Sequence, residues 1–225
     1  RPQRSTLFPY TTLFRSKMPD YNPRIHKEWA PILLGEDVQP YHLANRYYIR
    51  LGFDGIKYKS REKYDPAKIL LRKTGKGIIG AIDYFKRYTV QVVYQFMMRP
   101  KSELETLNPN FTNYSLEFLF GVITSRLMEF YYYNKFANPN QETFPHLIQA
   151  NVLALPIPIV DFAVQESESL LDYSTIVDTI RKIQEYQRMG LADRIPILLE
   201  RRDQAVAALY GLKMTEIDWK NGEKG

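Results

Sequence analysis

The sequence contains no cysteine, and its three histidines (His26, His42 and His146) are far apart along the chain. Disulfide bonds and thiolate metal sites are therefore excluded, and no zinc cluster is indicated. No apolar run approaches the ~20 residues that a bilayer-spanning helix needs, and the start shows no signal-peptide pattern. These absences predict a folded, soluble protein of the reducing cytoplasm, with no membrane contact and no metal of its own.

Motifs for nucleotide hydrolysis and nucleophilic catalysis are also missing. Gly75-Lys76-Gly77 lacks the spacing of a phosphate-binding loop, and there is no Gly-x-Ser-x-Gly elbow. Residues 218–220 (DWK) match the acid-x-Lys part of a metal-dependent nuclease motif, but no credible aspartate lies nearby upstream. His146 has apolar neighbours, which favour a structural histidine over a catalytic one. We therefore expect no catalysis from these residues.

Adenine-N6 methyl transfer needs an Asn or Asp-Pro-Pro-aromatic loop and a glycine-bearing turn for the cofactor, and neither occurs. Residues 108–111 (NPNF) come closest, but the third residue is not proline and the preceding segment is polar. We interpret them, and the weaker match at residues 138–141 (NPNQ), as ordinary Asn-Pro turns.

The first residues need separate treatment. Residues 6–16 (TLFPYTTLFRS) match the translation of a widely used sequencing adaptor. We therefore expect residues 1–16 to be an assembly scar without selected structure, and the gene to be truncated upstream of Lys17.

Charge is distributed unevenly along the chain. Without residues 1–16 the formal net charge falls from +6 to +3, but residues 17–100 hold 16 Lys and Arg against 8 Asp and Glu. Residues 101–225 hold 12 against 17. A basic half is what a phosphate-facing surface needs, although a solvated basic face on an ordinary domain explains the charge equally well.

The first part of the chain has the pattern of a mostly antiparallel sheet. Short β-type runs lie at residues 46–51, 55–58, 68–72, 78–82 and 89–96, separated by polar turns. The turn at residues 73–77 (KTGKG) has two glycines that suit a tight reversal. It predicts a protruding hairpin tip.

Helical patterns follow. Residues 114–134 are apolar on nearly every face, which predicts one buried helix. Two prolines keep residues 153–160 extended along an edge. A stripe of Ile176, Val177, Ile180 and Ile183 predicts a helix with Asp172 or Ser174 as N-cap and Gly190 at its end, and a second helix fits residues 197–210. The predicted fold class is α+β, with a domain at residues 17–160 and a helical segment at residues 161–225.

Basic and aromatic residues alternate in the basic half. They are Arg46, Tyr47, Tyr48 and Arg50, then Lys57, Tyr58, Lys59, Arg61, Lys63 and Tyr64, then Arg72, Lys73 and Lys76, then Lys86, Arg87 and Tyr88. Lysines and hydroxyls can contact phosphates, and arginine or amide side chains can read base edges.

Three blocks, KILLRKTGKGIIGAIDYFKRYTVQVVYQF, LEFLFGVITSRLMEFYYYN and FPHLIQANVLALPIP, occur in this order. Their order and spacing resemble the TaqI-type C-terminal specificity domain of adenine-N6 DNA methyltransferases and type IIG restriction-modification enzymes. The resemblance covers about residues 41–158, and the tail around DQAVAALYGLKMTE is similar to the closing helices of those proteins.

The resemblance implies a target-recognition domain that clamps double-stranded DNA so that the correct adenine flips into a separate catalytic domain. That missing methyltransferase domain, in cis or as a subunit in trans, would bind S-adenosylmethionine, and no cofactor is expected here. By position, the expected DNA-binding residues are Arg72, Lys73, Thr74 and Lys76 at the hairpin tip, with Lys57, Lys59, Arg61, Lys86 and Arg87 as phosphate contacts. Base-reading residues vary between specificities, so none is assigned.

Two alternatives remain open at this point. One is a free-standing specificity subunit of a type I system, although those usually carry two recognition domains and only one is visible here. The other is a protein-interaction module that does not bind DNA, whose basic half is fortuitous.

Overall fold

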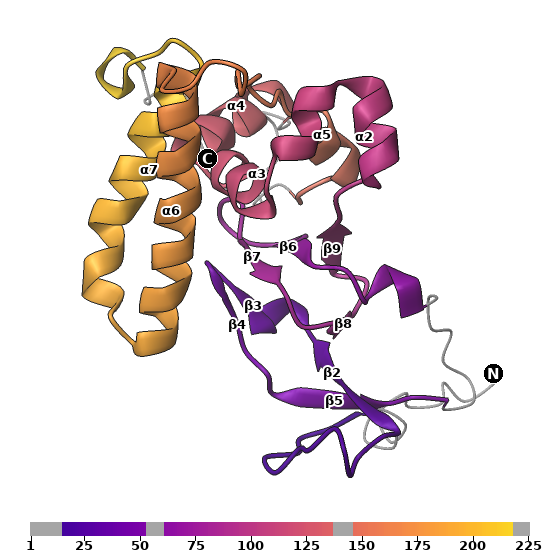
Figure 1. The fold of residues 1–225 in the computed structure, drawn as a ribbon. Coiled ribbons are helices and arrows are strands. Elements are labelled where there is room, and N and C mark those ends of the chain that lie inside the picture. The colour runs from indigo at the N-terminus through magenta and orange to yellow at the C-terminus, as the bar shows by residue number, and fades with distance from the viewer. Residues whose placement is uncertain (1–14, 53–60, 137–145, 218–225) are drawn as a thin grey trace, which may run out of the picture.

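The computed structural model describes residues 15–52, 61–136 and 146–217, which form the predicted α+β fold. The strands are β1 (Arg15–Ser16), β2 (Trp29–Leu33), β3 (Val38–Gln39), β4 (His42–Leu43), β5 (Tyr47–Arg50), β6 (Lys68–Arg72), β7 (Gly80–Asp83), β8 (Tyr88–Thr89) and β9 (Val93–Phe96). The α-helices are α2 (Lys101–Leu107), α3 (Leu116–Ile123), α4 (Arg126–Phe136), α5 (Gln149–Leu153), α6 (Glu168–Met189) and α7 (Ile195–Leu209). Short 3-10 helices are η1 (Gly35–Asp37), η2 (Arg61–Lys63), η3 (Pro109–Asn113), η4 (Ala192–Arg194) and η5 (Met214–Glu216). Figure 1 shows β2 and β5 at one end, α2 to α5 at the other, and α6 and α7 side by side along one flank.

The described strands form three small sheets, ordered β1-β5-β2-β8, β3-β4 and β7-β6-β9. All of these pairings are antiparallel except the one between β2 and β8. The predicted antiparallel pattern is therefore confirmed, but the strands form three sheets instead of one. In β1, Arg15 lies opposite Ile49 and Ser16 opposite Tyr48. These two residues, the last of the expected assembly scar at residues 1–16, therefore take part in a sheet.

The predicted hairpin is confirmed. β6 and β7 pair antiparallel with Lys68 opposite Asp83 and Leu71 opposite Gly80, and β9 covers the other edge of β6. The middle strand is buried on both faces. Ile69 and Leu71 contribute to the main core, and Leu70 packs in a second cluster with Leu33, Val38 and Val93.

The other predicted strands agree in part. Residues 46–51 contain β5, whereas residues 55–58 lie outside the described residues. Residues 89–96 are split into β8 and β9 by a turn in which the Val93 N–H donates to the Val90 carbonyl (3.0 Å). Strand β2 was not predicted, because Pro31 in its centre disfavours a strand; its partners on either side are β5 and β8.

The prediction of a single helix at residues 114–134 is wrong, because the helix is interrupted at Thr124 and Ser125, between α3 and α4. The Thr124 hydroxyl donates to the Phe120 carbonyl (2.7 Å) and the Ser125 hydroxyl to the Val122 carbonyl (2.7 Å). The Ser125 oxygen also accepts the Met128 N–H (3.2 Å), which makes it the N-cap of α4. Local side-chain hydrogen bonds therefore compete with the helix at this point.

Helices α6 and α7 form an antiparallel hairpin. The apolar stripe of α6 is buried as predicted, and Gly190 ends the helix with a φ of +72°. The predicted N-caps Asp172 and Ser174 are wrong, because the N-cap is Ser167, five residues before Asp172, and its hydroxyl oxygen accepts the Leu170 N–H (3.2 Å).

One apolar core joins the β6–β7 hairpin to the helices. It contains Phe118 and Phe120 of α3, Ile176 and Ile180 of α6, and Val206 of α7. Residues 17–160 and the helical segment that follows them therefore share a core. The extended segment predicted at residues 153–160 is wrong at its start, because Leu153 ends α5 and Ala154 caps this helix with a ψ of 2°. Residues 156–160 pass over the core without belonging to a strand, and tyrosines donate to two of their carbonyls: Tyr114 to Pro158 (2.8 Å) and Tyr210 to Pro156 (2.6 Å).

Candidate nucleic-acid interface

The tip of the β6–β7 hairpin, residues 73–77, is docked on the helical part of the domain. The Gly77 N–H donates to the Tyr133 hydroxyl of α4 (3.1 Å). On the other side of the tip, the Leu147 N–H donates to the Lys73 carbonyl (2.8 Å). The prediction of a protruding tip is therefore wrong, because α4 and the segment before α5 hold it in place.

The two tip glycines have the conformations that the turn needs. The φ angles of Gly75 and Gly77 are +141° and +85°, which side chains rarely adopt. A Cβ atom on Gly77 would lie 2.8 Å from a carboxylate oxygen of Glu129. The backbone angle therefore favours glycine at this position, whereas the contact with the flexible end of the Glu129 side chain requires only a shift of that carboxylate.

The hairpin brings four predicted DNA-binding residues together at this tip. Thr74 and Lys76 are exposed, whereas Arg72 and Lys73 are half-buried. The ammonium group of Lys73 lies 4.7 Å from the centroid of the Tyr94 ring. The Nε atom of Arg72 is buried and has no hydrogen-bond partner within the described residues.

A polar cavity of about 280 Å³ lies beside the tip, between Lys76, Arg126, Glu129 and Arg202. Burial raises the pKa of Glu129; Arg202 opposes the rise and the Asp203 carboxylate adds to it. Arg202 is itself neutralised by Asp203, whose carboxylate it contacts at 2.6 Å. The lining therefore holds three cations and two carboxylates, and Lys76 and Arg126 are its exposed cations.

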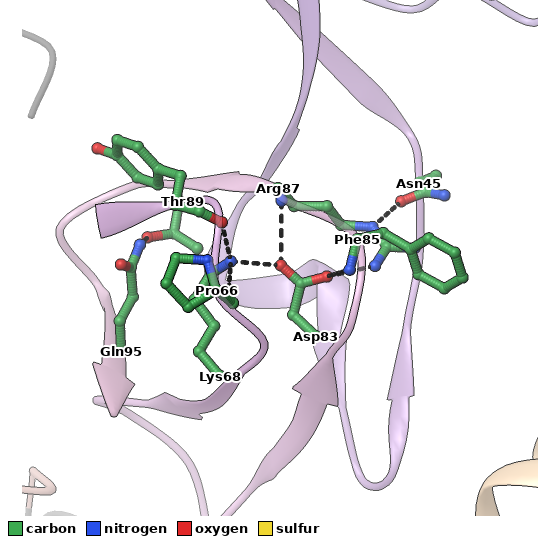
Figure 2. A network of polar contacts seen from close by, with 9 residues as sticks. Asn45, Pro66, Lys68, Asp83, Phe85, Arg87, Thr89 and Gln95 are labelled. Atoms are coloured by element: carbon green, nitrogen blue, oxygen red, sulfur yellow. Dashed lines mark hydrogen bonds and ion pairs between the residues drawn. The ribbon is translucent and has the colours of Figure 1, made fainter. Parts of the chain in front are cut away.

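The other end of the hairpin carries Lys86 and Arg87. Lys86 is exposed and pairs weakly with Asp65 at 3.5 Å. Arg87 is buried: its guanidinium contacts Asp83 at 2.6 Å and the Asn45 side chain at 2.7 Å (Figure 2). A direct phosphate contact by Arg87 stays a prediction, and these contacts give it a structural role.

Sequence reasoning missed the centre of this network, the ion pair between Lys68 and Asp83. Their charged atoms are 2.9 Å apart, and both side chains are fully buried (0% exposed). Burial alone would raise the pKa of Asp83, but hydrogen bonds from Lys68, the Phe85 N–H and Arg87 outweigh it and lower the pKa. The hairpin register was a usable signal, because it places these opposite charges directly across from each other.

The other predicted DNA-binding and basic residues belong to segments outside the hairpin or lie outside the described residues. Lys57 and Lys59 lie outside the described residues, and Arg61 begins η2. In the basic and aromatic run, Arg46 pairs with Glu36 (2.8 Å) and Arg50 with Glu28 (3.2 Å). Part of the positive charge of the basic half is therefore neutralised within the domain.

The structure describes two of the weak catalytic motifs, at Asn108 and at His146. The Asn108 side chain accepts the Asn110 N–H (3.0 Å), which confirms an Asn-Pro turn. His146 is exposed, so it is not a buried structural histidine. Within the described ranges no cluster of three His, Asp or Glu side chains could hold a metal ion. Residues 138–141 and 218–220 lie outside those ranges.

The fold and the basic groups at both ends of the hairpin define an α+β domain with a candidate nucleic-acid surface. The family model for the TaqI-like C-terminal specificity domain matches residues 30–157, which is more than half of the chain. The chain therefore belongs to this family, and the match supports a role in the DNA sequence specificity of methyltransferases and restriction enzymes. A search of curated proteins found no match. In the part of the chain that the structure describes, no helix has the length and apolar character needed to cross a bilayer.

Proposed function

We propose that this chain reads the sequence of double-stranded DNA as the specificity region of an adenine-N6 DNA methyltransferase or type IIG restriction-modification enzyme in the cytoplasm. The family match carries the proposal, because it spans the hairpin with its basic tip. The arrangement of Arg72, Lys73, Thr74 and Lys76 supports it, since cations and a hydroxyl gathered on one turn suit contacts to phosphate oxygens.

The docking of the tip supports the same function. Hydrogen bonds from Gly77 and Leu147 fix the turn before any ligand arrives. A preorganised turn loses little conformational entropy on binding, so more of the contact energy is available for affinity.

Methyl transfer belongs to a separate catalytic domain, in cis or supplied by another subunit, in this proposal. S-adenosylmethionine would bind there, where the flipped adenine is methylated. None of the described residues forms a glycine-bearing strand-to-helix turn that fits this cofactor.

The test is DNA binding by the full chain with Arg72→Ala and Lys76→Ala combined. We expect weaker binding to all sequences and a plot of log affinity against log salt that is flatter by ~2, since each neutralised phosphate contributes a slope of about 0.9. The control is Arg99→Ala with Lys101→Ala, an Arg–Lys pair near α2 whose partners are Glu103 and Glu105.

An unchanged slope in the tip variant would remove Arg72 and Lys76 from the interface. Absent or salt-insensitive DNA binding by the unmodified chain would refute the function itself and favour a protein-interaction module. Binding that requires an added catalytic subunit would indicate action in trans.

A further inference from the structure

The turn that follows β7, residues 83–87, is rigid and strained. One carboxylate oxygen of Asp83 accepts the Phe85 N–H (3.0 Å), and the other accepts the Arg87 N–H (3.1 Å). Lys86 adopts a φ of +39°, in the left-handed region that residues other than glycine seldom occupy. Such strain persists only where surrounding contacts enforce it, and it is concentrated at functional sites.

This turn presents aromatic side chains to the outside. Phe85 is 67% exposed and Tyr84 45% exposed, although both follow directly on a buried strand. The guanidinium of Arg87 lies 5.1 Å from the centroid of the Phe85 ring, a cation–π contact that orients it. The fold therefore holds a large apolar ring in water at a defined position.

Between this turn and helix α6 lies an open cleft of about 370 Å³. Its walls include Tyr84, Phe85, Arg181, Gln184 and Arg188. Arg181 lies 3.4 Å from Glu117, whereas exposed Arg188 has no ion-pair partner within the described ranges. Arg188 belongs to the acidic half of the chain, yet the fold places it beside the basic turn.

The two ends of the hairpin are suitably spaced for one ligand. Lys68 lies opposite Asp83 at this end, and Leu71 lies opposite Gly80 next to the tip. At ~3.3 Å per residue, five residues of β6 separate the two ends by roughly 15 Å. That is about half of the ~34 Å helical turn of duplex DNA, so one duplex can reach both ends.

We propose that the 83–87 turn and Arg188 of α6 form a second DNA-contacting element in which Phe85 is a specificity-determining residue. Lys86 and Arg188 bind backbone phosphates, and the Phe85 ring packs against a base edge, as apolar side chains do with the methyl group of thymine. This inference rests on the proposed function and extends it to residues that the family match does not assign.

The experiment is selection of bound sequences from a randomised duplex library by the full chain, followed by affinity measurements at several salt concentrations. Phe85→Ala should flatten the preference at one base-pair position about ten-fold, within the range expected for one lost base contact, while leaving the salt slope unchanged. Phe85→Leu, which keeps an apolar contact, should retain part of the preference. Arg188→Ala should flatten the salt slope by ~1 and keep the selected sequence.

Two control variants match these changes. Ile197→Ala removes an equally exposed apolar side chain (71% exposed) from α7, and Arg99→Ala removes an exposed arginine near α2. Neither should alter the selected sequence, and thermal melting verifies that each variant is folded.

The outcomes separate this inference from the proposed function. If Phe85→Ala selects the same sequence with the same preference, Phe85 does not read DNA and the inference is overturned. If the tip variant loses affinity while the Phe85 and Arg188 variants do not, the proposed function stands without the second element. If the unmodified chain selects no sequence, both fail.

Discussion

The buried network of Lys68, Asp83 and Arg87 leads to a sharp stability prediction. Its arrangement is asymmetric, because two cations share one carboxylate: Lys68 contacts Asp83 at 2.9 Å and Arg87 contacts it at 2.6 Å. Asp83→Asn removes the only negative charge of the three with almost no change in shape. Two buried cations then lose their counter-charge.

The expected loss of stability is large. Removing one partner of a buried ion pair typically costs 3–5 kcal/mol, a large share of the ~5–15 kcal/mol that holds a domain folded. At about 2–4 °C per kcal/mol, the melting temperature should fall by roughly 6–20 °C. Lys68→Met should cost less, about 1–3 kcal/mol, because Arg87 still neutralises Asp83 and mainly the Tyr64 carbonyl loses its donor.

Urea unfolding followed by circular dichroism measures both variants, and its dependence on pH supplies a second criterion. Because the pKa of Asp83 is lowered from its ordinary 3.8, its contribution to stability is present above that value. The contribution disappears as the pH falls through the lowered pKa. The difference between wild type and Asp83→Asn should therefore be constant near neutral pH and shrink in acid. A Lys68→Met variant as unstable as Asp83→Asn would refute this reasoning.

Two further predictions concern helix packing and the hairpin tip. Gly121→Ala should lower the free energy of unfolding by about 1–3 kcal/mol, because the new Cβ atom would lie 2.5 Å from the Ile176 side chain across the α3–α6 contact. Thermal melting measures this loss, and an unchanged melting temperature would mean that these helices separate easily. The Glu129→Gln variant should gain stability relative to wild type as the pH rises from 4 to 7. Burial raises the pKa of Glu129 and so disfavours its ionised form in the folded state. A difference in unfolding free energy between the two proteins that does not change with pH would contradict this prediction.

Local pattern was sufficient to predict the centre of the fold. The KILLR run and the Gly75 and Gly77 turn predicted β6 and the reversal after it, because continuous apolar runs and glycine turns are strong local signals. The α6 stripe was predicted for the same reason. Four of the predicted DNA-binding residues lie together because they share this one turn.

The errors arose where a side chain competes with the regular backbone pattern or where a partner is distant in sequence. Thr124 and Ser125 end one helix and begin another through their hydroxyls, although the apolar pattern continues across them. The docked tip depends on Tyr133, which is 56 residues away from Gly77. Neither effect has a periodic signal in the sequence.

Arg87 shows how a residue can serve the proposed interface without touching it. Together with Lys68 it carries two positive charges against the single negative charge of Asp83, so the network keeps one net positive charge beneath the turn that bears Lys86. Charges that are buried or nearly so are screened by salt less than exposed ones. The network therefore fixes the turn and adds a lasting positive potential to the surface where phosphates are proposed to bind. In this basic half, buried arginine and lysine side chains support the proposed DNA surface from below, whereas exposed ones are proposed to contact phosphates. Composition alone does not distinguish these two roles.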